Sequence, residues 1–254
     1  MEDKSSKIGL IIQARLGSKR FPGKLLMPFG DSHTVIQYLL NRLRNLGDSI
    51  PVIVATSNKK EDDQIVDILK RDEHVAVFRG EENNVLDRFV RCSIEYNLKK
   101  IIRICADNPF LDIDSVKQLV TFMKNNSVDY VSFFIDGKPA IKTHFGLWAE
   151  GVSLNALERV ASLTNEKKYL EHVTNYIYEN SQDFKISKLA VPDWFPYNYP
   201  IRLTIDTEKD YLNLCNVCMQ LKDKEISIEN IIRVIIKDNA LMESMSKEII
   251  FNQK

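Results

Sequence analysis

The segment from Gln13 to Lys24 carries a dense set of groups that could bind phosphate. Its cations are Arg15, Lys19, Arg20 and Lys24, and its flexible or donor-rich positions are Gly17, Ser18 and Gly23. Such a loop can wrap a polyphosphate, because glycines let backbone amides approach the oxygens while the cations offset the charge. The segment matches neither the Walker loop nor the dinucleotide fingerprint. On charge alone, a solvent-exposed basic turn is the alternative interpretation.

Two aspartates follow apolar segments elsewhere in the chain. Asp107 comes after Arg103–Ala106, and Pro109 stiffens the turn beyond it. Asp206 directly follows the segment 201–205, at the point where a helix is predicted to begin. Magnesium takes one or two protein carboxylates and completes its shell with water and phosphate oxygens. Each aspartate also has a structural interpretation, Asp107 as a turn residue and Asp206 as a helix N-cap.

Apolar strands and amphipathic helices alternate through the first half of the chain. Strands are predicted over Ile8–Gln13, Val52–Ala55, Val75–Phe78, Lys100–Cys105 and Tyr130–Phe134. Helices are predicted over Thr34–Leu46, Glu61–Arg71, Val85–Tyr96 and Ile113–Lys124. Near-continuous apolar strands are typical of parallel sheets buried on both faces, so the pattern predicts an open, mostly parallel α/β sheet. Ligands of such sheets bind beyond the carboxyl ends of the strands, where Lys24 and Asp107 are expected.

The regular alternation ends after Phe134. Residues 135–147 look irregular and 192–200 form a loop rich in proline and aromatic residues. Between and after them we predict helices over Ser153–Leu163, Lys167–Asn180, Thr207–Gln220 and Ile226–Lys237, and strands over Phe184–Val191 and Ile201–Ile205. We therefore expect a single domain over residues 1–254, with an arm inserted at about 138–200 and C-terminal helices from about 207.

The overall composition is that of a globular protein, with 44% hydrophobic and 28% charged residues among 254. Lysine plus arginine (35) equals aspartate plus glutamate (35), and this lack of basic excess argues against a nucleic-acid partner. No apolar run approaches the length of a membrane span, and the run beginning at Ile8 is too short for a signal peptide. We expect a cytoplasmic protein with no membrane partner.

Four cysteines are present, at Cys92, Cys105, Cys215 and Cys218. The last two have Cys-x-x-Cys spacing, but no second pair lies nearby and both fall inside a predicted helix. Free thiols are therefore favoured over a zinc or redox site.

The loop sequence Ile-Ile-x-Ala-Arg-x-x-Ser-x-Arg-x-Pro-Gly-Lys, residues 11–24, resembles the signature of cytidylyltransferases that activate acidic sugars. These are the acylneuraminate and 3-deoxy-manno-octulosonate enzymes, and the Gln-Ala-Arg version is most similar to the spore-coat polysaccharide biosynthesis protein F branch. Residues 103–109 fit the family's Arg-x-x-x-Asp-x-Pro, and residues 202–206 fit Arg-Leu-Thr-x-Asp. The resemblance covers about 8–220. It implies a Rossmann-like sheet of the nucleotide-diphospho-sugar transferase (glycosyltransferase-A-like) type with an inserted dimerisation arm.

The resemblance also implies roles for individual residues. The catalytic set is Arg15, Lys24, Asp107 and Asp206, and the two aspartates hold Mg²⁺. The nucleotide contacts are Gln13, Ala14, Arg15, Gly17, Ser18, Arg20, Lys24, Thr56, Ser57, Arg79, Gly80 and Ala106. The acceptor contacts are Arg79, Arg88, Asn108 and His172. From the residues alone, Arg88 could equally be a solvated helix side chain, and His172 a structural residue.

The implied reaction transfers CMP from CTP to a small acidic sugar and releases pyrophosphate, in the biosynthesis of surface polysaccharides or glycoconjugates. The acceptor oxygen attacks the α-phosphorus in line, and a metal-bound alkoxide is our hypothesis because no side chain stands out as a general base. A phosphorylated or phosphonate acceptor also fits the branch.

Two other functions fit parts of the sequence. Asp112-Ile113-Asp114 has the Asp-x-Asp pattern of nucleotide-sugar-dependent glycosyltransferases, but it opens a predicted helix, where Asp112 suits an N-cap and Asp114 the helix dipole. A non-catalytic nucleotide-binding module is the other possibility.

The predicted arm is rich in large apolar side chains: Phe145, Leu147, Trp148, Trp194, Phe195, Tyr197 and Tyr199. Such a surface can complete an acceptor pocket or be buried against another subunit. Because related sugar cytidylyltransferases use an insertion of this kind to dimerise, we expect a homodimer.

Overall fold

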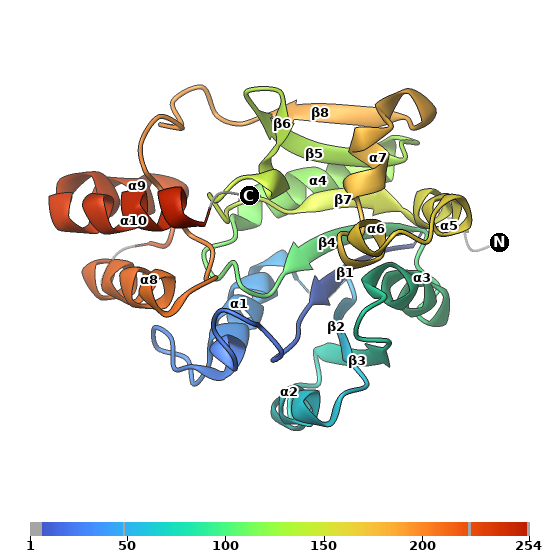
Figure 1. Ribbon diagram of the computed structural model, residues 1–254, viewed down its shortest axis with the longest axis horizontal. Helices are drawn as coiled ribbons and strands as arrows, with labels where there is room; N and C mark the ends of the chain where they lie inside the picture. The colour runs from blue at the N-terminus through green and yellow to red at the C-terminus, as the bar shows by residue number, and fades with distance from the viewer. Residues whose placement is uncertain (1–6, 48, 223–224, 253–254) are drawn as a thin grey trace.

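The computed structural model describes residues 7–47, 49–222 and 225–252. One eight-stranded sheet lies between two layers of helices (Figure 1). Its strands follow the order β3-β2-β1-β4-β7-β5-β6, and β8 pairs with β5. The predicted α/β class with an open, mostly parallel sheet is confirmed.

Four parallel strands form one half of the sheet. They are β1 (Ile8–Gln13), β2 (Val52–Ser57), β3 (Val75–Gly80) and β4 (Lys100–Cys105). Gln13, the last residue of β1, lies opposite Ala55 and Cys105 in the neighbouring strands. Because the carboxyl ends are aligned, the loops that follow these strands leave from one edge of the sheet.

The other half of the sheet is of mixed direction. It contains β5 (Tyr130–Ile135), β6 (Lys138–Pro139), β7 (Glu150–Ser153) and β8 (Ile186–Ala190). The strand β7 runs antiparallel to both β4 and β5, whereas β8 is parallel to β5. Residues 138–200 therefore supply strands to the central sheet itself.

The predicted strand over Ile201–Ile205 is wrong. The segment makes scattered backbone hydrogen bonds and belongs to no sheet ladder. Leu203 N donates to His144 O at 3.2 Å and Ile205 N to Asp107 O at 2.9 Å, so an extended chain runs past the loop that follows β4.

Two apolar clusters cover the two faces of the sheet. Leu10 and Ile12 belong to one and Ile11 to the other, as expected when successive strand side chains alternate. Over the first face lie α1 (Val35–Leu43), α2 (Asp63–Leu69), α4 (Ile113–Asn125), α8 (Glu208–Gln220), α9 (Ile228–Lys237) and α10 (Asn239–Phe251). Over the second lie α3 (Val85–Glu95), α5 (Leu154–Leu163), α6 (Lys167–Glu171) and α7 (Asn175–Glu179).

Short 3-10 helices occupy Lys24–Leu26, Arg44–Leu46, Lys60–Asp62, Ala140–Lys142 and Ser181–Asp183. Polar caps fix the starts of the main helices. Asp112, for example, accepts a hydrogen bond from Ser115 N at 2.9 Å, which confirms its predicted N-cap role. The helix predicted over Lys167–Asn180 is divided into α6 and α7 by a turn at 172–174.

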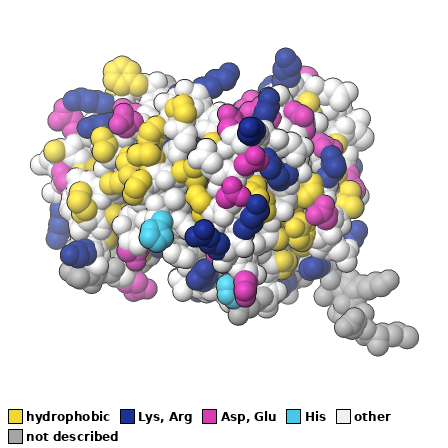
Figure 2. All heavy atoms as spheres, turned by 90° about the horizontal axis from the view of Figure 1, so that it is seen from below, with side chains coloured by type: hydrophobic (Ala, Val, Ile, Leu, Met, Phe, Trp, Pro, Cys, Tyr) yellow, Lys and Arg dark blue, Asp and Glu magenta, His cyan; other side chains and the backbone are white. Residues whose placement is uncertain are grey.

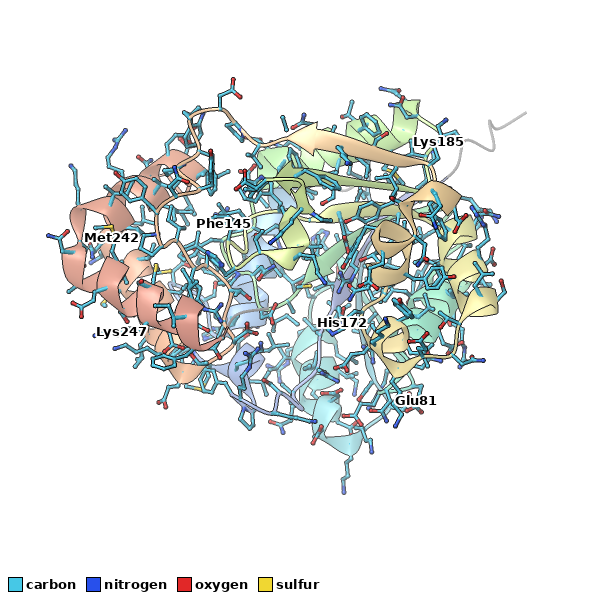
Figure 3. The ribbon with its side chains drawn as sticks, turned by 45° about the horizontal axis from the view of Figure 1, so that its top comes forward. Glu81, Phe145, His172, Lys185, Met242 and Lys247 are labelled. Atoms are coloured by element: carbon cyan, nitrogen blue, oxygen red, sulfur yellow. The ribbon has the colours of Figure 1, made fainter. Side chains whose placement is uncertain are left out.

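The aromatic residues of the predicted arm separate into two groups. Phe145, Leu147, Trp148 and Phe195 are buried, and the Trp148 and Phe195 ring centroids are 4.8 Å apart. Figure 3 shows Phe145 between the sheet and the C-terminal helices. Trp194, Tyr197 and Tyr199 are exposed. The buried group belongs to the chain's own core, and a dimerisation role for the region stays a prediction.

Across the described ranges, no helix combines the length and the apolar character needed to span a membrane.

Candidate active site

Lys24, Asp107 and Asp206 meet at the carboxyl edge of the parallel strands. Lys24 Nζ lies 2.7 Å from Asp107 Oδ2 and 3.8 Å from Asp206 Oδ1. The three residues come from the loop after β1, the loop after β4 and the segment before α8. The structure thus brings together the cationic turn and the two distant aspartates.

The turn before Lys24 depends on Gly23. Its φ is +72°, in the left-handed region that glycine adopts at little cost. Lys24 then starts a 3-10 helix with its side chain buried, and Nζ donates to Ile205 O at 2.5 Å. The lysine therefore connects the N-terminal loop to both acidic segments.

Asp206 is held by a buried arginine and a second carboxylate. Arg202 Nη2 donates to Asp206 Oδ2 at 3.1 Å, and Arg202 Nε donates to Asp210 Oδ1 at 2.7 Å. Asp210 Oδ2 also accepts hydrogen bonds from the backbone N–H groups of Asp206 and Thr207. Burial lowers the pKa of Arg202, but the bonds to Asp210 outweigh it and raise that pKa.

The alternative interpretation of Asp206 as an N-cap is wrong. Thr207 caps α8, in a reciprocal capping box with Asp210. The Asp206 carboxylate instead contacts cations: besides Lys24 and Arg202, it lies 3.0 Å from Arg20 Nη2.

A cavity of about 450 Å³ opens beside Asp107. Of the predicted site residues, it is lined by Gln13, Arg20, Asp107, Asn108 and His172. Figure 3 shows His172 near the centre of the molecule, at the α6–α7 segment. Sequence reasoning missed further polar lining residues, namely Arg103, Lys142, Thr143, Asn175, Tyr178 and Thr204. Asp107, beyond the end of β4, and His172, between α6 and α7, thus line one space.

Trp148 also lines a second cavity, of about 1000 Å³. Asp112 and Asp114, the Asp-x-Asp pair, line this second cavity. The pair therefore lies outside the site built around Lys24, which argues against its use as the metal motif of a glycosyltransferase.

Arg79 and Arg88, both predicted to contact the acceptor, do not line the cavity beside Asp107. The Arg79 guanidinium donates to Ser57 O and Lys59 O, each at 2.9 Å, and to Asp63 Oδ1 at 2.6 Å. These contacts fasten β3 to the connection between β2 and α2.

Arg88 is fully buried and donates to Glu81 O at 3.1 Å. Burial, and then the charge of Arg15, lower its pKa to about 10. Gly80 makes room for it, because a Cβ there would lie 3.0 Å from Arg88 Cγ. The interpretation of Arg88 as a solvated side chain is wrong.

At the strand ends, the residues that were predicted to contact the nucleotide can offer it mainly backbone groups. Ala14, Thr56, Ser57, Gly80 and Ala106 are all buried. At Gly17 an added Cβ would lie 2.7 Å from Glu61 Oε1, so the loop packs closely on the 3-10 helix Lys60–Asp62, which precedes α2. Ser18 Oγ accepts from Phe21 N at 3.4 Å within the same loop.

Asp62 is a positioning residue that the sequence did not reveal. Its buried carboxylate accepts from Leu16 N at 2.7 Å and from Ser57 Oγ at 2.5 Å. It thereby ties the loop after β1 to the end of β2. In the sequence, Asp62 is a carboxylate in the first turn of a predicted helix, and that position does not indicate hydrogen bonds to the loop after β1 or to the end of β2.

Arg15 extends from the loop to α6, where its Nη2 lies 3.0 Å from Glu171 Oε1. Both side chains are partly exposed, so this ion pair is weak and can be exchanged for another partner. On the face seen in Figure 2, basic and acidic side chains are interleaved rather than gathered by sign.

Asp107 and Asp206 are the carboxylates of this site that could hold a metal ion. Within the described ranges no group of three or more His, Cys, Asp or Glu side chains could hold one. Two oxygen donors fit Mg²⁺, which binds through one or two carboxylates together with phosphate oxygens and water, better than they fit zinc. The four cysteines are free thiols, as predicted.

The comparison with known proteins decides the family. A family model described as "Cytidylyltransferase" matches residues 10–249. The chain belongs to the cytidylyltransferase family.

Several proteins share most of the chain. An uncharacterized protein of Methanocaldococcus jannaschii is 42% identical over 205 residues, covering 81% of this chain and 80% of that protein. The spore coat polysaccharide biosynthesis protein SpsF of Bacillus subtilis is 36% identical over 208 residues, covering 79% and 82%. The structure of a cytidylyltransferase from Leptospira borgpetersenii superposes with a TM-score of 0.81 at 30% identity, covering 93% of this chain and 97% of that one. The chain is thus an enzyme of this family, similar to the predicted branch.

Proposed function

We propose that this cytidylyltransferase transfers CMP from CTP to a small acidic, sugar-like acceptor and releases pyrophosphate, in the biosynthesis of a surface polysaccharide or glycoconjugate. The observation that carries the proposal is the convergence of Lys24, Asp107 and Asp206 beside a polar cavity. The 36% identity to SpsF of Bacillus subtilis supports the biosynthetic setting.

The loop from Gln13 to Lys24 would bind the triphosphate. Lys24 lies where it can neutralise charge on the departing pyrophosphate, and Arg15 can leave the exposed Glu171 to contact a phosphate. The buried residues at the ends of β2 and β3 offer backbone groups to the nucleoside. Catalysis then consists largely of positioning and charge neutralisation.

Asp107 and Asp206 would hold Mg²⁺ together with the phosphate oxygens. The ion would supply charge neutralisation on the triphosphate and would acidify the acceptor hydroxyl. The chain's own residues fix the two carboxylates: Arg202 and Asp210 orient Asp206, while Lys24 contacts both aspartates.

The acceptor would occupy the cavity beside Asp107. Its acidic group was expected to meet Arg79 or Arg88, but the basic side chains that line this cavity are Arg20, Arg103, Lys142 and His172. Lys142 is exposed and lies 5.5 Å from the centroid of the Tyr178 ring, so its ammonium is available at the cavity wall. We propose Lys142 and His172 as the residues that hold the acceptor's anionic group.

The test is a pyrophosphate-release assay with each nucleoside triphosphate and a panel of carboxylated, phosphorylated and phosphonate acceptors. Asp107→Asn should abolish magnesium-dependent turnover while the circular dichroism spectrum stays native. The matched control is Asp112→Asn, because asparagine also caps helices and Asp112 lies outside the site. Release of a nucleoside diphosphate from a nucleotide sugar, with no pyrophosphate from CTP, would overturn the proposal in favour of a glycosyltransferase.

We also propose that the enzyme works as a cytoplasmic homodimer. The exposed aromatic residues of the 192–200 loop, Trp194, Tyr197 and Tyr199, supply the kind of side chains enriched at subunit contacts. Sedimentation of the wild type and of Trp194→Ser at micromolar concentration tests this; a wild type that remains monomeric would contradict it.

A further inference from the structure

A buried carboxylate at the start of β7 joins three elements of the site. Glu150 has no exposed surface. Its Oε1 accepts from Arg103 Nη1 at 2.5 Å and from Thr174 Oγ1 at 2.9 Å, and its Oε2 accepts from Tyr130 OH at 2.5 Å. These partners lie on β4, on the turn between α6 and α7, and on β5.

Arg103, which Glu150 holds in place, in turn restrains Gln13 by a hydrogen bond. Its Nη2 donates to Gln13 Oε1 at 2.9 Å. Because a guanidinium can only donate, the oxygen of the Gln13 amide has to face Arg103 and the NH₂ group has to face away. Within the part of the chain that the structure describes, no group accepts a hydrogen bond from Gln13 Nε2. Gln13 is half-buried and lines the cavity beside Asp107.

We infer that Glu150 is a positioning residue: through Arg103 it fixes the Gln13 amide so that the NH₂ group faces the acceptor cavity. Gln13 then selects acceptors that have an oxygen atom opposite this NH₂ group. The inference rests on the proposed function, because it describes the acceptor of that reaction. It moves Gln13 from the predicted nucleotide contacts to the acceptor side. A fixed N–H donor pairs with a hydroxyl, carbonyl or carboxylate oxygen and rejects a cationic or purely apolar group.

The same carboxylate restrains a second wall of the cavity. Thr174, which donates to Glu150 Oε1, lies between His172 and Asn175, and both of these line the cavity. Glu150 therefore fixes the two sides of the acceptor space relative to each other. Burial and the Glu150 carboxylate both raise the pKa of Tyr130, so its hydroxyl stays a donor to Glu150 throughout the usual pH range.

Gln13→Glu tests the inference, because it keeps an oxygen that faces Arg103 and replaces the NH₂ donor by an anionic oxygen, which can only accept a hydrogen bond and repels an acidic acceptor. The KM for the acceptor should rise about tenfold or more, while the KM for CTP should change less than about twofold. The assay uses 3-deoxy-manno-octulosonate and N-acetylneuraminate as acceptor probes. An unchanged KM for an acceptor that the wild type uses would overturn the inference.

Glu150→Gln tests the positioning step with a readout that needs no acceptor. In amide NMR spectra the side-chain NH₂ resonances of Gln13 are identified by their loss in Gln13→Glu. They should shift in Glu150→Gln and stay in place in Glu179→Gln. Glu179 is a matched control because its carboxylate also accepts from a tyrosine hydroxyl, whereas the bond from Arg103 goes to Glu150.

The two hypotheses fail in different ways. A wild type that releases no pyrophosphate from CTP with any acceptor refutes the proposed function. Gln13 resonances that are identical in the wild type and in Glu150→Gln overturn the positioning role of Glu150, whatever the acceptor proves to be.

Discussion

Lys24 Nζ lies 2.7 Å from Asp107 Oδ2, although 83 residues separate the two along the chain. The lysine is nearly buried, so its ammonium depends on Asp107, Asp206 and Ile205 O for the contacts that water would otherwise provide. A bound triphosphate would have to share this cation with the two aspartates. The pair therefore links nucleotide binding to the acidic half of the site.

Lys24→Met should reduce turnover by about a hundredfold or more, because the proposed mechanism uses this charge to stabilise the departing pyrophosphate. Lys19→Met is the matched control, since Lys19 belongs to the same loop but is exposed. Initial rates of pyrophosphate release with CTP measure both variants. Equal losses in the two would show that the loop acts only through its overall charge.

Glu171→Gln should raise the affinity for CTP severalfold, because Arg15 no longer has a competing carboxylate 3.0 Å away. The cost in stability should stay below about 1 kcal/mol, since both side chains of the pair are partly exposed. Calorimetric titration with CTP measures the affinity, and Glu166→Gln, which removes another exposed acid near α6, is the control. Weaker CTP binding in Glu171→Gln would mean that the pair holds Arg15 in its binding position.

Asp210→Asn should lower the free energy of unfolding by roughly 3 kcal/mol, because it leaves the buried Arg202 guanidinium without its main counter-charge. Asp114→Asn should change it by less than about 0.5 kcal/mol, since that carboxylate is exposed and its ion pair with Lys117 lies at the surface. Urea denaturation followed by circular dichroism gives both values. A small change in Asp210→Asn would show that Asp206 and backbone groups suffice to hold Arg202.

Stability should fall as the pH rises from about 8 to about 11, and Cys92 should account for part of the fall. Burial raises the pKa of this thiol from 9.0 to about 12. Between these values the unfolded chain loses the proton while the folded chain keeps it, so folding becomes less favourable, by roughly 1 kcal/mol at pH 10. Urea denaturation at pH 7 and pH 10 should show a smaller difference between the two pH values for Cys92→Ala than for the wild type. If the difference between the two pH values is the same in Cys92→Ala and in the wild type, Cys92 does not cause the loss of stability.

The sequence predicted the parallel half of the fold well. The bounds of β1 and β4 agree residue for residue, because apolar residues dominate both strands and the charged residues Arg15 and Asp107 lie two positions beyond their ends. The meeting of Lys24 with Asp107 was also predicted, since loops that follow parallel strands share one edge. Asp206 joins them from a segment that is not a strand, so that argument does not account for its position. These features depend on local patterns that recur along the chain.

The mixed half could not be predicted in the same way. The strand β7 spans only Glu150–Ser153 and begins with a buried glutamate, so it carries no apolar signature. The strand β7 runs antiparallel to β4, so its amino end lies at the edge of the sheet where the carboxyl ends of the parallel strands lie. The sequence argument looked for site residues at carboxyl ends alone. The structural role of Arg79 could not be predicted from its residue type either. The carbonyl oxygens that accept hydrogen bonds from its guanidinium belong to residues distant in the sequence.

The partition at Trp148 bears on how acceptor preference can change during evolution. Trp148 lines both the cavity beside Asp107 and the larger cavity of about 1000 Å³. We expect a smaller residue at that position to connect the two spaces and admit a longer molecule, while the loop from Gln13 to Lys24 and the two aspartates stay in place. Substrate range in this scaffold is therefore adjustable independently of the chemical step, through a single codon.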